Sequence, residues 1–152
     1  MNFKLSQVPD RTTKPRQYGL TMVMDKGLSI RQIEDMLEIS APHIDIVKLG
    51  WATSFVTPNL KDKIAVYKNA GIPVYFGGTL FEAFVVRNQC EDYRRLIDEY
   101  GLEYAEVSDG SVYMPEEIKC DFIKVLAEQV KVLSEVGSKD ETKIIPPYQW
   151  MQ

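Results

Sequence analysis

The chain alternates between short apolar runs and longer segments in which apolar residues recur every three or four positions. Runs of the first kind are typical of buried β-strands, and segments of the second kind are typical of amphipathic helices. The pattern predicts five strands, at Gly19 to Asp25, Ile44 to Gly50, Pro73 to Gly78, Glu103 to Asp109 and Lys131 to Gly137.

Each of the first four predicted strands is followed by a predicted helix. These helices are expected over residues 29–39, 58–70, 79–99 and 115–129. The first has the clearest start, because Ser29 is suited to cap the N-terminus of a helix whose apolar residues fall on one face. The third is long, and we expect it to break near Cys90. Residues Pro146 to Gln152 are expected to begin a further element.

Short strands that alternate with helices of ten or more residues indicate βαβ units and a parallel sheet. The units recur about every 25–30 residues, as right-handed crossovers require. No G-x-G-x-x-G sequence follows the first strand, where Asp25, Lys26 and Gly27 stand instead. This disfavours a dinucleotide-binding domain and leaves a barrel or a flavodoxin-like sheet.

The chain is short for a complete barrel. A (βα)8 barrel takes about 250 residues, whereas the 152 residues here supply about five of the eight strand-helix units. We therefore expect truncation, a natural short product, or a sheet that another chain completes. The predicted organisation is a leader over residues 1–18 and a partial (βα) barrel domain over residues 19–152. Open strand edges predict association into a homo-oligomer.

Charge and composition narrow the class of partner. The net charge is −4, and no basic run is longer than the pair Arg94 and Arg95, so we expect no nucleic-acid partner. No apolar stretch approaches the length of a membrane span. Cys90 and Cys120 have no metal-binding spacing and fit a reducing compartment. A cytoplasmic protein that acts on small molecules is expected.

Polar groups stand at the ends of the predicted strands. Alternate residues of a barrel strand point inward, and active sites of such barrels lie at the C-terminal ends of the strands. The inward columns are predicted to be Thr21, Val23 and Asp25; Ile44, Ile46 and Lys48; Tyr104, Glu106 and Ser108; and Lys131, Leu133 and Glu135.

The carboxylates of Asp25, Glu106 and Glu135 are oxygen ligands of the kind that Mg²⁺ prefers, and Lys48 offers a positive charge. A structural ion pair between Lys48 and Glu106 is the alternative for those two residues. Because buried charges are costly unless they are paired or bound, we favour function for the set. Asp109 has the opposite parity to Glu106 along the fourth predicted strand and begins a turn, so a role in the turn is the alternative to a role as a ligand.

Three loops at the same end of the sheet offer further candidates. Gly77, Gly78 and Thr79 lie between a strand and a helix and could present N–H groups to a phosphate, or could simply form a tight turn with Thr79 as N-cap. The segment from Lys48 to Ser54 could form a loop that lines a phosphate site, or a turn anchored by Trp51. Lys139 follows the fifth strand and could act as a general acid or base.

Five segments resemble the successive motifs of phosphosulfolactate synthases and their bacterial relatives. They are GLTMVMDKG, IDIVKLGWATS, GIPVYFGGTLFE, YAEVSDGS and SEVGSKD, in this order. The resemblance covers nearly the whole chain after about Lys14. It implies an α/β fold of the (βα)8 TIM-barrel type, of which this chain holds about five units.

The resemblance also implies a function. The family is a group of carbon-sulfur lyases that add sulfite to phosphoenolpyruvate, with Mg²⁺, to give (2R)-phospho-3-sulfolactate, which is the first step towards coenzyme M in methanogens and is linked to sulfolactate in bacteria. The implied metal ligands are Asp25, Glu106 and Glu135, the implied catalytic residues are Lys48, Lys139 and Glu106, and the implied substrate contacts are Lys26, Gly77, Gly78, Thr79 and Ser108.

Two other functions stay open. The chain could be a non-catalytic truncated or stress-associated homologue of the same barrel family. It could also be a barrel aldolase that forms a Schiff base through Lys48 or Lys139.

Overall fold

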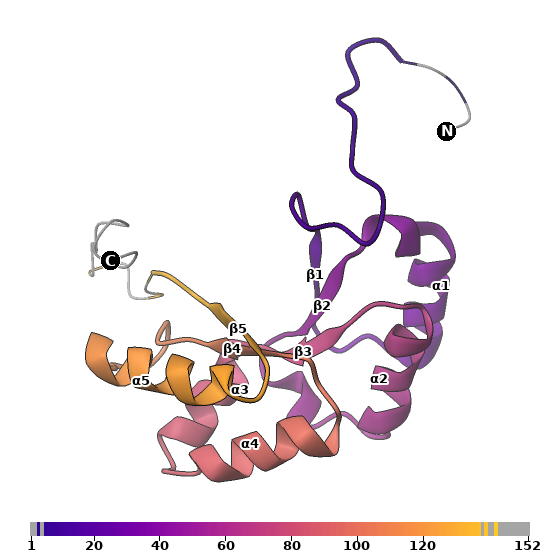
Figure 1. Ribbon diagram of the computed structural model, residues 1–152. Helices are drawn as coiled ribbons and strands as arrows, with labels where there is room; N and C mark the ends of the chain where they lie inside the picture. The colour runs from indigo at the N-terminus through magenta and orange to yellow at the C-terminus, as the bar shows by residue number, and fades with distance from the viewer. Residues whose placement is uncertain (1–2, 4, 138, 140–141, 143–152) are drawn as a thin grey trace.

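A computed structural model describes the chain except for residues 1–2, 4, 138, 140–141 and 143–152 (Figure 1). The element predicted from Pro146 lies outside the described residues. Strands and helices follow in the order β1 (Met22–Asp25), α1 (Ile30–Ser40), η1 (Ala41–His43), β2 (Ile46–Leu49), η2 (Thr53–Phe55), α2 (Leu60–Asn69), β3 (Val74–Phe76), α3 (Gly78–Val85), α4 (Cys90–Glu99), β4 (Tyr104–Val107), α5 (Glu116–Ala127) and β5 (Lys131–Ser134).

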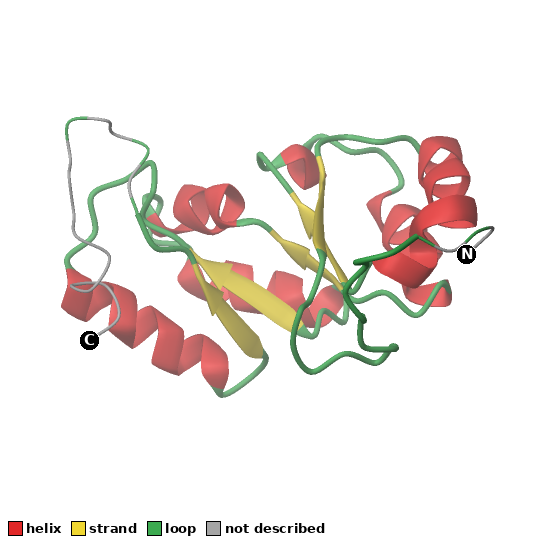
Figure 2. Cartoon of the chain, turned by 90° about the horizontal axis from the view of Figure 1, so that it is seen from above, coloured by secondary structure: helices red, strands yellow, loops and turns green. Residues whose placement is uncertain are grey.

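The strands are parallel and lie side by side in the order of the sequence. β1, β2 and β3 form one sheet, and β4 and β5 form a second. β3 contacts β4, so the two sheets adjoin, as Figure 2 shows. Parallel strands in sequential order with intervening helices are the arrangement of a (βα)8 barrel. The predicted TIM-barrel type is confirmed, as a partial barrel, over the residues that the structure describes.

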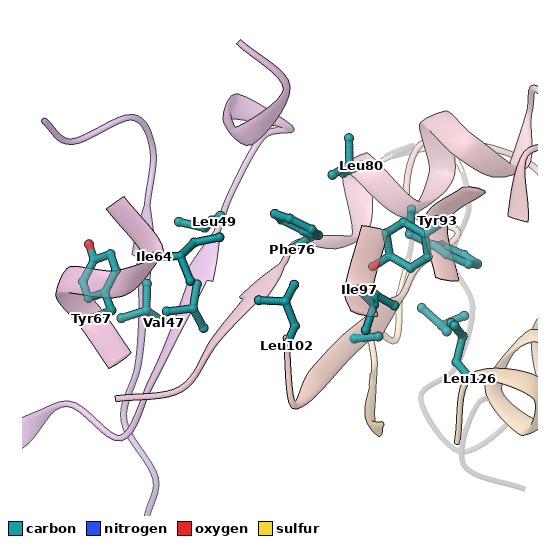
Figure 3. Packing of buried hydrophobic residues seen from close by; sticks show 14 of the residues in the cluster. Val47, Leu49, Ile64, Tyr67, Phe76, Leu80, Tyr93, Ile97, Leu102 and Leu126 are labelled. Atoms are coloured by element: carbon teal, nitrogen blue, oxygen red, sulfur yellow. The ribbon is translucent and has the colours of Figure 1, made fainter. Parts of the chain in front are cut away.

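One face of the strands packs against the helices and forms the core. Val47 and Leu49 of β2 and Phe76 of β3 are fully or almost fully buried there, against Ile64 and Tyr67 of α2 (Figure 3). Strand residues of the other parity are absent from this cluster among the described residues. The opposite face is therefore the inner face of the barrel, as side-chain alternation requires.

Aromatic rings connect the helices that follow β3 and β4. Phe81 of α3 is fully buried, and its ring centroid lies 5.6 Å from that of Tyr93 and 5.4 Å from that of Phe122, both in edge-to-face geometry. Edge-to-face pairs at this distance contribute about 0.5–1.5 kcal/mol each beyond area burial. This packing holds α3, α4 and α5 together behind the second sheet.

The helix boundaries have local causes. α1 begins with a capping box in which Ser29 and Gln32 bond each other's backbone N–H groups. The long helix predicted after β3 does break, into α3 and α4, and Asn88 in the break has a positive φ of 56°.

No helix of the described residues is long and apolar enough to cross a membrane.

The segment before β1 is bound to the barrel end opposite the predicted site. Arg16 donates from Nη1 to Oδ1 of Asp45, at 2.7 Å, just before β2. Lys14 donates to the backbone carbonyls of Ala41 and Ile44. Cations stabilise the carbonyl end of a helix, and α1 ends here. Part of the predicted leader thus belongs to the fold.

The orientation of β1 differs from the prediction. Asp25 and Val23 were expected to point into the barrel, but they point to the helix face: Val23 packs against the core, and Asp25 is fully buried against α2. Met22 and Met24 lie on the inner face instead and are partly exposed. Apolar residues occupy both parities of this strand, so alternation alone did not determine its orientation.

Four groups of the protein satisfy the Asp25 carboxylate. Lys63 Nζ lies 2.9 Å from Oδ2 and 3.0 Å from Oδ1, and the Tyr67 hydroxyl donates to Oδ2. The N–H groups of Gly27 and Leu28 donate to Oδ1. Burial alone would raise the pKa of Asp25, but these donors together outweigh it and lower the pKa. Asp25 is therefore a structural residue that ties β1 to α2.

We predict that Lys63→Met destabilises the protein by about 3–5 kcal/mol near neutral pH, because it leaves a buried carboxylate without its cation. The folded pKa of Asp25 is lowered below its ordinary value of 3.8, so the pair stabilises the fold above that pH and this contribution is lost as the pH falls through the lowered pKa. The difference from wild type should shrink below about pH 4. Urea unfolding at several pH values measures it.

Lys61→Met is the matched control. Lys61 lies on the same helix, but its ion pair with Glu99 is exposed. Exposed pairs contribute little, so the urea midpoint should barely move. Equal losses from the two lysine substitutions would contradict the structural role of the Asp25 pair.

Candidate active site

The inner face of the barrel holds a cavity of about 270 Å³ at the C-terminal ends of the strands. Each described strand, the loop after it or, for β3, the start of the following helix contributes to its wall, as in the active sites of (βα)8 barrels. The lining residues are Met24, Lys48, Trp51, Thr79, Ser111, Glu135 and Lys139. A larger cavity of about 500 Å³ lies between the loops after β1 and β2, but its one lysine, Lys63, is held by Asp25.

Lys48 and Glu106 form an ion pair beside this cavity. Lys48 Nζ of β2 lies 2.6 Å from Oε1 of Glu106 on β4, and both side chains are largely buried. The same oxygen accepts a hydrogen bond from the Gly78 N–H, at 2.8 Å. The structure thus brings the two predicted residues together, in the arrangement of the predicted ion pair, and Lys48 also lines the cavity.

Tyr75 of β3 is a member of this cluster that the sequence analysis missed. It is almost fully buried, and the Glu106 carboxylate acts electrostatically on its hydroxyl. Burial raises the pKa of Tyr75, and the negative charges of Glu106 and Glu135 raise it further, so the hydroxyl stays protonated. The sequence shows only a hydroxyl-bearing side chain within the apolar run Val74 to Phe76, and the face that Tyr75 shares with Lys48 is known only from the strand register in the structure.

The glycine turn before α3 serves the protein's own contacts. A Cβ atom at Gly77 would lie 2.8 Å from Cε of Lys48, and one at Gly78 would lie 2.3 Å from Cβ of Ser108. The glycines are therefore needed for space. The Gly78 N–H, predicted to face a phosphate, donates to Glu106 instead. A carboxylate is stabilised at this position by the helix dipole.

Three predicted substrate contacts lie at different depths. The N-cap of α3 is Gly77, so the alternative with Thr79 as N-cap is wrong, and Thr79 lines the cavity. Ser108 is fully buried beneath the cavity and bonds Glu82. Lys26 lies 5.4 Å from the ring centroid of Trp51, which is exposed and does not anchor its turn in the core.

Lys139 lies at the mouth of the cavity and is exposed. Its Nζ donates to Oγ of Ser111 at 3.1 Å, and its backbone N–H donates to the Gly110 carbonyl at 3.0 Å. Ser111 was not among the predicted residues. The loops after β4 and β5 are thus joined, and they place a second lysine amine at the cavity.

The predicted carboxylates do not all meet. Glu135 lines the cavity and Glu106 lies on the same inner face, but Asp25 is on the other side of the sheet. Asp109 also points to the helices, where Lys119 binds it at 2.7 Å. Among the described residues no three metal-binding side chains gather. The predicted set with Asp25 therefore does not form a site.

The arrangement is suited to a small anion. Lys48 and Lys139 bring positive charge to the cavity, and the Thr79 and Ser111 hydroxyls can donate hydrogen bonds. Lys48 is held in place by Glu106, whereas Lys139 has an exposed, less constrained amine. The first can stabilise charge at a set position, and the second can exchange protons.

Sequence comparison shows which known proteins this chain resembles. The profile of the (2R)-phospho-3-sulfolactate synthase (ComA) family matches residues 9–152. The chain is 38% identical to the phosphosulfolactate synthase of Bacillus subtilis over 140 residues, which is 92% of this chain and 56% of that protein.

Two archaeal proteins of the same name are similar. Identity is 38% over 135 residues with the protein of Methanothermobacter thermautotrophicus and 41% over 126 residues with that of Methanocaldococcus jannaschii. These matches cover 87% and 81% of this chain and 52% and 50% of those proteins. The chain spans about half the length of the curated relatives it matches.

We predict that Gly78→Ala lowers stability by about 1–3 kcal/mol, because the added methyl group would overlap Ser108 and push α3 away from β4. Thermal unfolding followed by circular dichroism measures the loss. Gly110→Ala is the control, since a Cβ there would meet its nearest neighbour, Cε of Lys139, at 3.4 Å. Equal unfolding midpoints for Gly78→Ala and wild type would show that the close approach of α3 to β4 is not required.

Proposed function

The chain belongs to the (2R)-phospho-3-sulfolactate synthase family, and on this premise we propose that it is a lyase that adds sulfite to phosphoenolpyruvate to give (2R)-phospho-3-sulfolactate. The observation that carries the proposal is the cavity at the C-terminal strand ends, which Lys48 and Lys139 both line. Both substrates and the product are anions, which two lysine amines beside hydroxyl donors suit.

In the proposed reaction the sulfur lone pair of sulfite attacks the methylene carbon of phosphoenolpyruvate and forms the C–S bond. The electrons of the C=C double bond move to the carboxylate, so negative charge builds up on its oxygens. Lys48, held by Glu106, stabilises this charge. The Lys139 ammonium group then donates a proton to the carbon that bears the phosphate, and the phosphate ester stays intact.

The substrate phosphate is proposed to lie towards Thr79 and Lys26, on the side of the cavity opposite Lys139. Thr79 lines the cavity near the N-terminus of α3, and Lys26 lies over the Trp51 ring. Gly77 and Gly78 shape this wall through their lack of side chains. Ser108 acts from below the cavity, through its contacts with Glu82 and the loop after β4.

Magnesium is part of the proposal. Glu135, with Glu106 on the same inner face, would hold the ion together with oxygens of the substrate, because Mg²⁺ is often bound by one or two carboxylates and by phosphate oxygens. When bound, the ion would supply Lewis-acid stabilisation of the developing negative charge. The positioning of Glu135 supports this, since its backbone is fixed by a hydrogen bond to the Val107 carbonyl.

The cellular setting is also proposed. We place the protein in the cytoplasm as a homo-oligomer, in a route to sulfolactate or coenzyme M. Support for association comes from the outer strands: Met22 of β1 and Val136 after β5 are exposed apolar residues. The Schiff-base alternative through Lys48 is disfavoured because its amine is engaged in an ion pair with Glu106 and is not free to attack a carbonyl.

The first prediction from this function concerns turnover. Mixed with phosphoenolpyruvate, sulfite and Mg²⁺, the protein should form phosphosulfolactate, detected by mass spectrometry. Lys139→Ala should slow the reaction by about 10²- to 10⁴-fold, which is the usual contribution of a general acid. Lys124→Ala, an exposed lysine on α5, is the control and should leave the rate unchanged.

The assay should be run on this chain and on a chimera that continues into the remaining part of the Bacillus subtilis relative. Product from either form supports the proposal. Product from the chimera alone would show that turnover requires the added part of the relative. If neither form made product, the non-catalytic function would take its place.

The second prediction concerns the metal. Glu135→Gln should raise the Mg²⁺ concentration needed for half-maximal turnover by about tenfold or more, since it removes a charged ligand. Glu117→Gln on α5 is the matched control, because Glu117 lies in the first turn of that helix and does not line the cavity. An unchanged Mg²⁺ requirement in Glu135→Gln would remove Glu135 from the proposed site.

A further inference from the structure

Glu82 of α3 is a buried carboxylate behind the cavity that the proposed reaction does not use. It is 2% exposed and does not line the cavity. Glu82 lies four residues after Gly78, so the two share one face of the helix. Gly78 lets this face approach β4 closely, and Glu82 therefore reaches the loop that follows the strand.

Among the described residues, the side-chain hydrogen bonds of Glu82 go to that loop. Its Oε1 accepts a hydrogen bond from Oγ of Ser108 at 2.5 Å and one from the Ser111 N–H at 3.3 Å. Its Oε2 is buried and has no partner among the described residues. A buried polar group is costly unless it is bonded, so packing alone would favour an apolar residue here.

The same loop holds Lys139. Oγ of Ser111 accepts from the Lys139 amine, and the Gly110 carbonyl accepts from the Lys139 backbone N–H. The Gly110 N–H donates in turn to Oγ of Ser108, at 3.2 Å. A continuous set of hydrogen bonds thus runs from Glu82, through Ser108 and Ser111, to the amine at the cavity mouth.

We propose that Glu82 is a positioning residue: by holding Ser108 and Ser111 it fixes the loop after β4 so that the Lys139 amine faces the cavity. The importance of the Lys139 amine rests on the proposed function, whereas the hydrogen bonds from Ser108 and Ser111 to Glu82 do not depend on it. Glu82 itself does not line the cavity, so its effect on chemistry is transmitted through Ser111, which does.

The test measures how reactive the Lys139 amine is, which requires no turnover. The protein is acetylated with limiting acetic anhydride, and peptide mass spectrometry gives the rate at Lys139 relative to exposed Lys124. Glu82→Gln should raise this ratio by about three- to tenfold, because it weakens the contacts that hold the Ser111 hydroxyl against the amine. The kcat for sulfite addition should fall while the KM for phosphoenolpyruvate stays unchanged.

A double-mutant cycle separates positioning from general loosening of the fold. Ser111→Ala removes the hydroxyl that binds the amine but keeps the backbone N–H that binds Glu82. In that background Glu82→Gln should have no further effect on Lys139 reactivity, since the two changes act on one contact. An equal increase in both backgrounds, or no increase in a folded Glu82→Gln protein, would overturn the proposal.

Two further variants complete the experiment. Asp45→Asn removes a largely buried carboxylate charge at the other end of the barrel and should leave the Lys139 ratio unchanged. If Glu82→Gln does not fold, Ser108→Ala tests the same connection, because it removes the 2.5 Å hydrogen bond and should raise the ratio in the same direction. If sulfite addition is absent from wild type but the cycle is non-additive, the proposed function fails and the positioning role stands.

Discussion

The ion pair between Lys48 and Glu106 is the interaction on which the site depends. It joins β2 of the first sheet to β4 of the second at 2.6 Å, and Glu106 also accepts from the N-terminus of α3. Removal of one partner of such a pair commonly costs about 3–5 kcal/mol, because the other charge stays buried without compensation. One contact therefore helps to fix the position of the two sheets, the start of α3 and the place of the Lys48 charge at the cavity.

A second kind of ion pair works on the opposite face of the strands. Lys63 binds Asp25 and the carbonyl of Leu28, and Lys119 binds Asp109 and the carbonyl of Glu135. In both cases a lysine from a helix bonds a carboxylate at a strand end and a carbonyl in a nearby loop. Charges at strand ends thus divide into two groups: those towards the helices hold the fold, and those towards the barrel axis form the cavity.

Much of the fold follows from local sequence. The apolar runs and helical periodicities locate all five strands, and the break between α3 and α4 falls where the pattern weakens near Cys90. The inner-face parity of Lys48, Glu106 and Glu135 is also correct. Tyr75 was missed because the register with Lys48, which puts it on the inner face, is known only from the structure.

The sequence by itself determined the order of strands and helices, the family, and the polar residue types that lie at the strand ends. Only the tertiary structure decided which of those residues share a face, because a side chain's partner is set by packing between distant elements. Lys63 turns Asp25 into a structural residue, and Glu106 takes the Gly78 N–H that a phosphate was predicted to use. Glu82 acquires its connection to Lys139 only because α3 approaches β4.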